Sequence, residues 1–449
     1  MAADRASTKR AKADPSARLM GNGLSALRII ASAPIIERFG LRPMLTKAIF
    51  EGAKRGYGAV TSITAKQSAS TDTPAKKMAK PSVPSLFDLK PTDEQVMMVE
   101  TVRRFSTDYL REHARAADDA SSLPDEVVRA WNELGMVEML MPEAYGGFAE
   151  ERSPISVALV LEALSHGDAG MTWGLLAPMS VALLLLDHGT DAQRATYLQR
   201  FVGEDPAVAS LAIMEPSVLF DPRRLSTVAE QTQGGWLLHG KKTLVARASD
   251  ASLFVVAART PRGPALFLVD ADATGVEIRE EPAMGLRSAD VANLELTAVA
   301  VGEDALLGGT VSHEMYLDVL VRSRAAWCAV ASGTAAAVSE FVGPYANDRV
   351  AFGEPISHRQ AVAFLIADLA IETQSMRLTM LRAVSRLEYG LAAAANVAIA
   401  RRLAAEKGMY IGTNGVQLLG GHGFVKEYLM ELWYRNLRGA GILEGGLYL

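Results

Sequence analysis

The sequence predicts an α+β protein of several domains, with an N-terminal α-helical domain, a central β-domain and a C-terminal α-helical bundle. Three observations predict this order. Apolar residues recur with helical spacing from about residue 88 to residue 204, and short strand-like runs separated by turn residues follow up to about residue 303. Helical spacing then returns after Gly309. Because the strands are grouped rather than alternating with helices, we expect separate cores instead of an alternating parallel sheet.

The chain accordingly divides into four predicted segments. They are a basic N-terminal extension with a linker (1–87), a helical domain (88–204), a β-domain (205–308) and a C-terminal helical domain (309–449). A chain of 449 residues is long enough to give two or three such domains their own cores.

The first helix of the second segment is marked by a capping box. Thr92 stands three positions before Gln95, and valines follow with helical spacing. Further helices are predicted over Pro124–Leu134, Ile155–Ser165 and Ala192–Phe201. Strands are predicted over Ala207–Ile213, Trp236–His239, Leu253–Ala257, Ala265–Val269 and Val291–Leu296.

Charge is distributed unevenly along the chain. Residues 1–90 hold 16 Lys/Arg and 6 Asp/Glu, a net of +10, and the remaining residues hold 30 and 45, a net of −15. The amphipathic stretch Pro43–Tyr57 is interpreted either as a membrane-surface or substrate-delivery helix or as a helix docked on the body of the protein. No membrane-spanning segment is predicted, so we expect a cytoplasmic protein with peripheral membrane contact through this extension.

Several chemistries lack their motifs. The single cysteine, Cys328, predicts neither a disulfide nor a metal cluster, and the histidines have no metal-ligand spacing. A P-loop, a zinc-protease helix and a nucleophile elbow are missing from the sequence as well. We therefore predict no bound metal and no nucleic-acid partner.

Four ordered blocks carry the most specific signal. They are residues 415–424 (GVQLLGGHGF) followed by Arg435 and by Leu443-Glu444-Gly445, then residues 348–353 (DRVAFG), residues 212–216 (AIMEP) and residues 285–288 (GLRS). Together with the α–β–α order, these blocks resemble the acyl-CoA dehydrogenase family over about residues 88–445. The resemblance implies a flavoprotein that binds FAD at the interface of a homodimer or tetramer.

The resemblance also implies how FAD is held. Arg349 and Phe352 of one subunit would hold the adenosine–pyrophosphate part, and Gln417, Gly420 and Gly421 of another would back it. Arginine suits a pyrophosphate because its planar fork makes charge-assisted bonds in fixed geometry. By themselves, the glycines are equally well explained as a tight turn between helices.

The reaction implied is the α,β-dehydrogenation of an acyl thioester to the trans-2-enoyl thioester. Glu444 occupies the family's position for the base that removes the α-proton, while the β-hydrogen leaves as hydride to the flavin. Some members carry the base immediately before an arginine on another helix. That arginine is Arg324 here, and Ser323 before it cannot serve. Arg324, Phe220 and Gly445 are the substrate-binding candidates.

Around the flavin ring the sequence departs from the family pattern. Ile213, Met214 and Ala246 occupy the ring-facing positions, and the family has threonine where Met214 and Ala246 stand. Its Gly-Ser pair is replaced by Leu219-Phe220. Each lost hydroxyl should remove about 1 kcal/mol of binding.

Three functional hypotheses follow. The first is an acyl-CoA dehydrogenase that passes its electrons to an electron-accepting flavoprotein. The second is an acyl-CoA oxidase or related flavin oxidase. The third is a non-catalytic subunit that keeps the fold to complete or stabilise a partner's site. Retention of Glu444 and Arg349 favours an active site, whereas the missing hydroxyls favour the third hypothesis.

Overall fold

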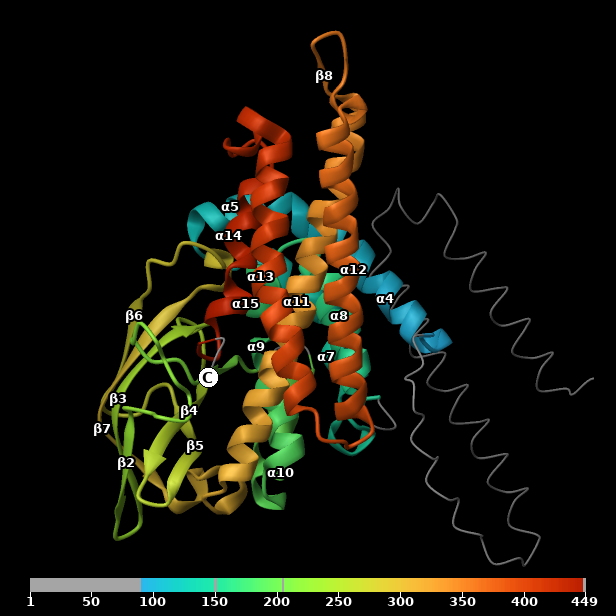
Figure 1. Ribbon diagram of the computed structural model, residues 1–449. Coiled ribbons are helices and arrows are strands. Elements are labelled where there is room, and N and C mark those ends of the chain that lie inside the picture. Colours follow the sequence, from blue (N-terminus) through green and yellow to red (C-terminus); the bar gives the residue numbers. More distant parts are fainter. Residues whose placement is uncertain (1–89, 149–151, 204–205, 447–449) are drawn as a thin grey trace, which may run out of the picture. The chain divides into compact units, whose positions relative to one another are not determined.

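The computed structural model describes residues 90–148, 152–203 and 206–446. The basic N-terminal extension, including the amphipathic stretch Pro43–Tyr57, lies outside the described residues. The elements follow one another as helices, then strands, then helices, so the predicted fold class is confirmed (Figure 1).

The N-terminal domain is helical throughout its described part. Its elements are α4 (Asp93–Phe105), the π-helical turn η1 (Ser106–Leu110), α5 (Arg111–Ala120), α6 (Asp125–Glu133), α7 (Met136–Leu140), η2 (Glu143–Tyr145), α8 (Pro154–Ser165), α9 (Ala169–His188), α10 (Asp191–Tyr197) and η3 (Leu198–Phe201). The predicted capping box is present, because the Thr92 hydroxyl accepts from the backbone N–H of Gln95 at 3.2 Å and the Gln95 side chain accepts from the N–H of Thr92 at 3.0 Å.

The central domain is one seven-stranded sheet in the order β1-β4-β2-β3-β7-β6, with β5 paired to β4. Its strands are β1 (Ala209–Ala212), β2 (Val228–Thr232), β3 (Gly235–Val245), β4 (Leu253–Thr260), β5 (Gly263–Asp270), β6 (Val276–Glu280) and β7 (Ala292–Gly302), with the short helical turns η4 (Arg287–Ala289), η5 (Glu303–Ala305) and η6 (Leu307–Gly309). Strand β1 runs parallel to β4, and the long pair β3–β7 is antiparallel. The sheet lies beside helices α9 and α11 (Figure 1).

Two strands of the central sheet, β2 and β6, were not predicted from the sequence. Their sequences, VAEQT and VEIRE, are rich in charged and polar residues, and most of their side chains are exposed or half-buried. VAEQT has no alternation that would mark a strand. VEIRE does alternate apolar and charged residues, which is a signal of a half-buried strand, and pairing with β3 and β7 establishes both strands.

The C-terminal domain is built on three long helices that lie side by side (Figure 1). Its elements are α11 (His313–Asp348), the hairpin β8 (Val350–Ala351) and β9 (Glu354–Pro355), η7 (Ile356–His358), α12 (Gln360–Glu388), α13 (Ala394–Leu419), η8 (Gly420–Gly423), α14 (Met430–Leu437) and α15 (Gly439–Ile442). The β8–β9 hairpin stands out beyond the end of α11 (Figure 1).

By length and composition two of the described helices, α9 and α11, could cross a membrane. In each helix the most apolar window is largely buried inside the protein, 83% in α9 and 72% in α11. Helices in a core between two domains bury more than one face and are therefore apolar on several sides. Such a position explains the apolar character of α9 and α11 equally well.

A buried carboxylate ties the three domains together. Asp168, at the N-terminus of α9, accepts from the Ser288 hydroxyl of the β-domain at 2.7 Å and from the Asn436 amide of α14 at 3.0 Å. Burial raises the pKa of Asp168 from its ordinary value. Its neighbour Gly170 is needed for this contact, because a Cβ there would stand 2.3 Å from the Ser288 hydroxyl.

Candidate active site

The predicted base lies on a tight turn after α15 that two arginines hold. The backbone of Glu444 has φ +60°, a left-handed conformation that is strained for a residue with a Cβ. Arg324 of α11 donates to the Glu444 carbonyl through two nitrogens, at 2.7 and 3.2 Å. Arg401 of α13 donates to the carbonyls of Leu443, at 2.5 Å, and Gly445. Contacts from two helices therefore hold a turn that the local sequence would not adopt alone.

The carboxyl group of Glu444 is buried between these helices and the β-domain. Its Oε1 accepts from the Ser323 hydroxyl at 2.9 Å. Its Oε2 is buried and has no hydrogen-bond partner among the described residues. Burial raises the pKa of Glu444, against the lowering effects of the Ser323 hydrogen bond and of the charges on Arg401, Arg324 and Lys242.

Lys242 brings a third cation to this carboxyl group from strand β3. Its ammonium group is fully buried and donates to Glu215 Oε1 at 2.9 Å and to the Ile213 carbonyl at 3.2 Å. Burial lowers the pKa of Lys242 to about 8. Burial alone would raise the pKa of Glu215, but the Lys242 charge and the hydrogen bonds from Lys242, Ser226 and Thr227 hold it below its usual value.

Phe220 lies against the base turn from the β-domain side. Its carbonyl accepts from the N–H of Gly446 at 3.1 Å, and only 4% of the residue is exposed. Gly445 is required here, since its φ is +92° and a Cβ would stand 2.5 Å from Pro222 Cδ. The preceding Val218 and Leu219 are fully and largely exposed. The structure therefore brings all three predicted substrate-binding residues, Arg324, Phe220 and Gly445, together beside Glu444.

The predicted ring-facing residues lie on the β-domain next to this turn. Ile213, Met214 and Ala246 are all buried, and the N–H of Thr243 donates to the Met214 carbonyl at 3.0 Å. The β3–β7 pairing is irregular between Lys242 and Val245, which brings this end of β3 out of regular pleating. These three side chains provide an apolar surface and no hydroxyl.

The predicted adenosine–pyrophosphate residues lie at the other end of the C-terminal domain. Arg349 immediately precedes β8, and Phe352 lies in the turn between β8 and β9, where it is 97% exposed. Gln417, Gly420 and Gly421 are exposed at the end of α13, and a Cβ added to either glycine would meet nothing within 4 Å. The structure thus leaves this set open to solvent.

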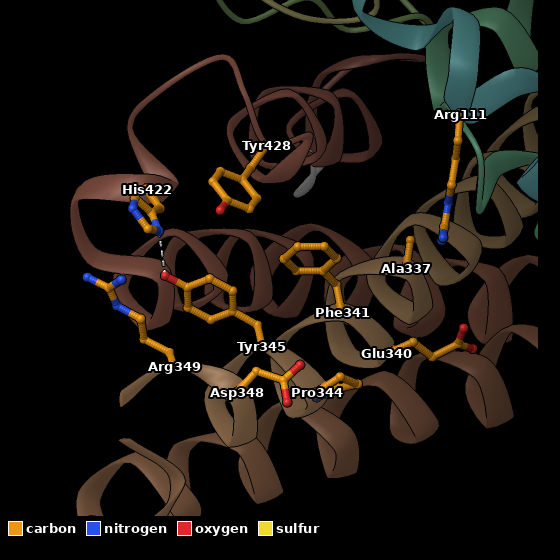
Figure 2. A pocket seen from close by; sticks show the side chains of 10 residues that line it. All are labelled: Arg111, Ala337, Glu340, Phe341, Pro344, Tyr345, Asp348, Arg349, His422 and Tyr428. Carbon is orange, nitrogen blue, oxygen red and sulfur yellow. Dashed lines mark hydrogen bonds between the residues drawn. The ribbon is translucent and has the colours of Figure 1, made fainter. Parts of the chain in front are cut away.

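A cavity of about 570 Å³ lies beside this set, along the C-terminal half of α11 (Figure 2). Arg349 and His422 stand at one end of it and Arg111 at the other, with Phe341, Tyr345 and Tyr428 between them (Figure 2). The Tyr345 hydroxyl and His422 Nδ1 are 2.8 Å apart, and the rings of His422 and Tyr428 are stacked at 5.2 Å. This aromatic wall was not predicted from the sequence, because its members come from distant segments.

The residues present fit FAD at both ends of the molecule. At the phosphate end, Arg349 supplies charge and Gly420 and Gly421 leave their backbone approachable. At the ring end, Met214 and Ala246 are buried apolar residues of the β-domain, and Glu444 offers a buried carboxylate oxygen without a partner among the described residues. The ring end would hold a flavin by apolar contact. It lacks the two threonine hydroxyls that the family has at the positions of Met214 and Ala246.

Comparison with known proteins agrees with the fold. The chain matches the N-terminal, middle and C-terminal domains described as acyl-CoA dehydrogenase over residues 92–205, 210–299 and 314–446. The domains that it matches are those of flavin-dependent oxidoreductases that act on CH–CH bonds. The chain belongs to the acyl-CoA dehydrogenase family, whose cofactor is FAD.

Individual relatives cover most of the chain. The short-chain specific acyl-CoA dehydrogenase of Bos taurus is 30% identical over 78% of this chain and 86% of its own length. The cyclohex-1-ene-1-carbonyl-CoA dehydrogenase of Geobacter metallireducens is 28% identical over 79% of this chain and 95% of its own. The solved structure of butyryl-CoA dehydrogenase from Megasphaera elsdenii has a TM-score of 0.75 at 25% identity and covers 81% of this chain and 97% of that one.

Three residues that surround the turn of Glu444 were not predicted to act there. Ser323 was considered only as an inadequate base, yet its hydroxyl contacts the Glu444 carboxyl. Arg401 and Lys242 were not candidates, although one holds the turn and the other places a buried cation near it. An arginine within an otherwise alanine-rich helix such as α13, and a lysine inside a buried strand, are signals that sequence reasoning could have used.

Proposed function

We propose that this enzyme dehydrogenates an acyl-CoA thioester between its α- and β-carbons, with Glu444 as the base. The observation that carries the proposal is the buried Glu444 Oε2, which has no hydrogen-bond partner among the described residues. An unpaired buried carboxylate oxygen is costly, and such groups concentrate where a substrate supplies the missing partner. The α-hydrogen of a bound thioester would face this atom.

The surroundings of Glu444 suit a base. Burial raises the pKa of its carboxyl group, which makes the carboxylate a stronger proton acceptor than an exposed glutamate. Arg401, Arg324 and Lys242 oppose this rise and favour the ionised form that can take a proton. FAD, when bound, supplies the acceptor for the hydride that leaves the β-carbon.

The other residues of the site bind and orient in this proposal. Phe220 and Gly445 line the substrate side of the turn, and Arg324 holds the backbone of the base in place. Ile213, Met214 and Ala246 offer their apolar surface to the flavin ring. These contacts exclude water from Glu444, so the carboxylate is not hydrogen-bonded to water and is left to accept the α-proton of the substrate.

We infer that a second copy of the chain completes the cofactor site. Arg349, Phe352, Gln417 and the two glycines are exposed and lie far along α11 and α13 from the base turn. Exposed Phe364, Ile371 and Leu378 recur every seven residues along α12, which gives that helix an apolar stripe fit for another helix. A homodimer or tetramer would cover both the exposed cofactor residues and the apolar stripe of α12. An electron-accepting flavoprotein would reoxidise the reduced flavin.

The test of the base is Glu444→Gln. The amide keeps the size of the side chain but cannot take the proton, so anaerobic bleaching of the bound flavin by an acyl-CoA should slow 10²–10⁴-fold. Binding of the thioester, measured by titration, should be unchanged. Glu427→Gln, an exposed glutamate of the same domain, is the control and should bleach at the wild-type rate. A rate for Glu444→Gln within about threefold of wild type would show that Glu444 is not the base.

The non-catalytic hypothesis keeps one supporting observation, the absence of hydroxyls at Met214 and Ala246. Purified protein that contains FAD and is bleached by any member of an acyl-CoA panel would reject that hypothesis. Colourless protein whose melting temperature does not change on adding FAD would favour it.

A further inference from the structure

Ser323 occupies a distinctive place on α11. It directly precedes Arg324, which holds the backbone of Glu444, while its own hydroxyl stands 2.9 Å from Glu444 Oε1. Adjacent residues of one helix therefore contact the backbone and the carboxyl group of the same glutamate. A hydroxyl opposite an ionised carboxylate must donate, because the carboxylate has no proton to give.

The hydrogen bond makes the two carboxylate oxygens unequal. The terminal torsion of a glutamate is broad and roughly two-fold, so nothing in the side chain itself distinguishes Oε1 from Oε2. Oε1 uses one of its lone pairs on Ser323, whereas Oε2, which is unpartnered among the described residues, has both lone pairs available to a ligand.

We propose that Ser323 is a positioning residue, which holds Glu444 Oε1 so that Oε2 alone receives the α-proton of the substrate. The inference rests on the proposed role of Glu444 as the base. It gives this position on α11 a role other than that of a base, since a hydroxyl is too weak a base to remove the proton but is a good donor to the carboxylate.

The charges around Glu444 set the background against which Ser323 acts. Arg324 and Arg401 face it from α11 and α13, and Lys242, paired with Glu215, faces it from the β-domain. Tyr316 of α11 also lies within electrostatic reach; its hydroxyl is buried and donates to the Pro222 carbonyl at 2.6 Å. None of these groups replaces the directional bond that Ser323 makes to one oxygen.

Removal of the hydroxyl should therefore favour the protonated form of Glu444. A hydrogen bond to a charged group is stabilising, and its loss in Ser323→Ala should raise the pKa of Glu444 by about one unit. Since the base acts only when ionised, the acidic limb of the pH–rate profile should move to higher pH by the same amount. Ser323→Thr keeps a hydroxyl and should restore the wild-type value, and Ser323→Cys, a weaker donor, should lie between.

The direct measurement is infrared titration of the Glu444 carboxylic C=O band on the full-length protein, with the band identified by its loss in Glu444→Gln. Ser332→Ala is the matched control, because Ser332 lies on the same helix and its hydroxyl donates to Glu162 Oε1 at 2.7 Å. This control should leave the Glu444 band unchanged. Melting temperatures confirm that each variant is folded.

Two outcomes would overturn the inference. One is a Glu444 pKa in Ser323→Ala within about 0.2 units of wild type; the other is a shift that Ser323→Thr fails to reverse. The infrared titration needs no turnover, so its result is independent of catalysis. If the titration behaves as expected while Glu444→Gln still bleaches the flavin, the proposed function fails and the Ser323–Glu444 coupling stands.

Discussion

The two ends of the candidate site are built in opposite ways. At the base end, Glu444, Arg401, Lys242 and Phe220 are buried, and helices α11 and α13 and strand β3 all contribute to one small volume. At the end predicted to hold the adenosine–pyrophosphate part, called here the dinucleotide end, Arg349 and Phe352 are exposed at the β8–β9 hairpin, and Gly420 and Gly421 are exposed after α13.

This difference indicates that one chain forms the base end completely, whereas the dinucleotide end needs a second copy of the chain. A buried carboxylate needs its cations and donors in place before the substrate arrives, so the base end must be complete within one fold. An exposed side chain such as Phe352, and exposed glycines such as Gly420 and Gly421, add little to the stability of the isolated chain. The base end should therefore respond to mutation through stability, and the dinucleotide end through binding and assembly.

The largest effect is expected from Lys242→Met at the base end. The substitution leaves Glu215 as an uncompensated buried charge, which should lower the free energy of unfolding by about 3–5 kcal/mol. Urea unfolding measures this. The adjacent Lys241→Met is the control, because Lys241 is 61% exposed and its pair with Glu295 contributes at most about 1 kcal/mol. An equal loss of unfolding free energy in Lys242→Met and Lys241→Met would contradict the claim that burial of Lys242 causes the effect.

A companion variant sharpens the same test. Lys242→Met combined with Glu215→Leu removes both charges and should recover much of the lost stability. Recovery should be incomplete, since the N–H groups of Ser226 and Thr227, which donate to Glu215 at 2.7 and 2.9 Å, would lose their acceptor. A double variant no more stable than Lys242→Met would show that the pair is not the source of the effect.

At the dinucleotide end, Arg349→Ala should weaken FAD binding about 10- to 100-fold with little change in the melting temperature of FAD-free protein. The lost interaction is a charge-assisted hydrogen bond, typically about 1.5–3 kcal/mol. Fluorescence titration of FAD gives the affinity. Arg359→Ala, at an exposed arginine near the same hairpin that pairs with Glu354 at 3.0 Å, should bind FAD normally. Loss of affinity in both variants would indicate a general charge effect instead of a site.

The smallest effect is expected from Phe352→Ser. Because the side chain is 97% exposed, the folded chain loses almost no contact and its stability in dilute solution should hold within about 0.5 kcal/mol. Assembly should weaken, and sedimentation at several concentrations would show a shift toward smaller species. Leu219→Ser, at another exposed apolar residue in the β-domain, should leave assembly unchanged. Unaltered sedimentation of Phe352→Ser would place the interface elsewhere.

Local sequence signals predicted much of what the structure contains. The Thr92–Gln95 capping box begins a helix as expected, and the order of helical and strand-like stretches gave the fold class. The C-terminal blocks also led to Glu444 as the candidate base. These features depend on residues close together in the chain, or on periodicity over a few turns, and such patterns are visible without coordinates.

The tertiary structure alone decided how the carboxylate of Glu444 is surrounded. Ser323 lies 121 residues away along the chain, and Arg401 and Lys242 come from a different helix and from the β-domain. No periodic pattern links such residues, because their proximity depends on how α11, α13 and β3 pack against one another. Burial by that packing raises the pKa of Glu444, so the sequence determined which residue stands at the predicted base position and the fold determined its proton affinity.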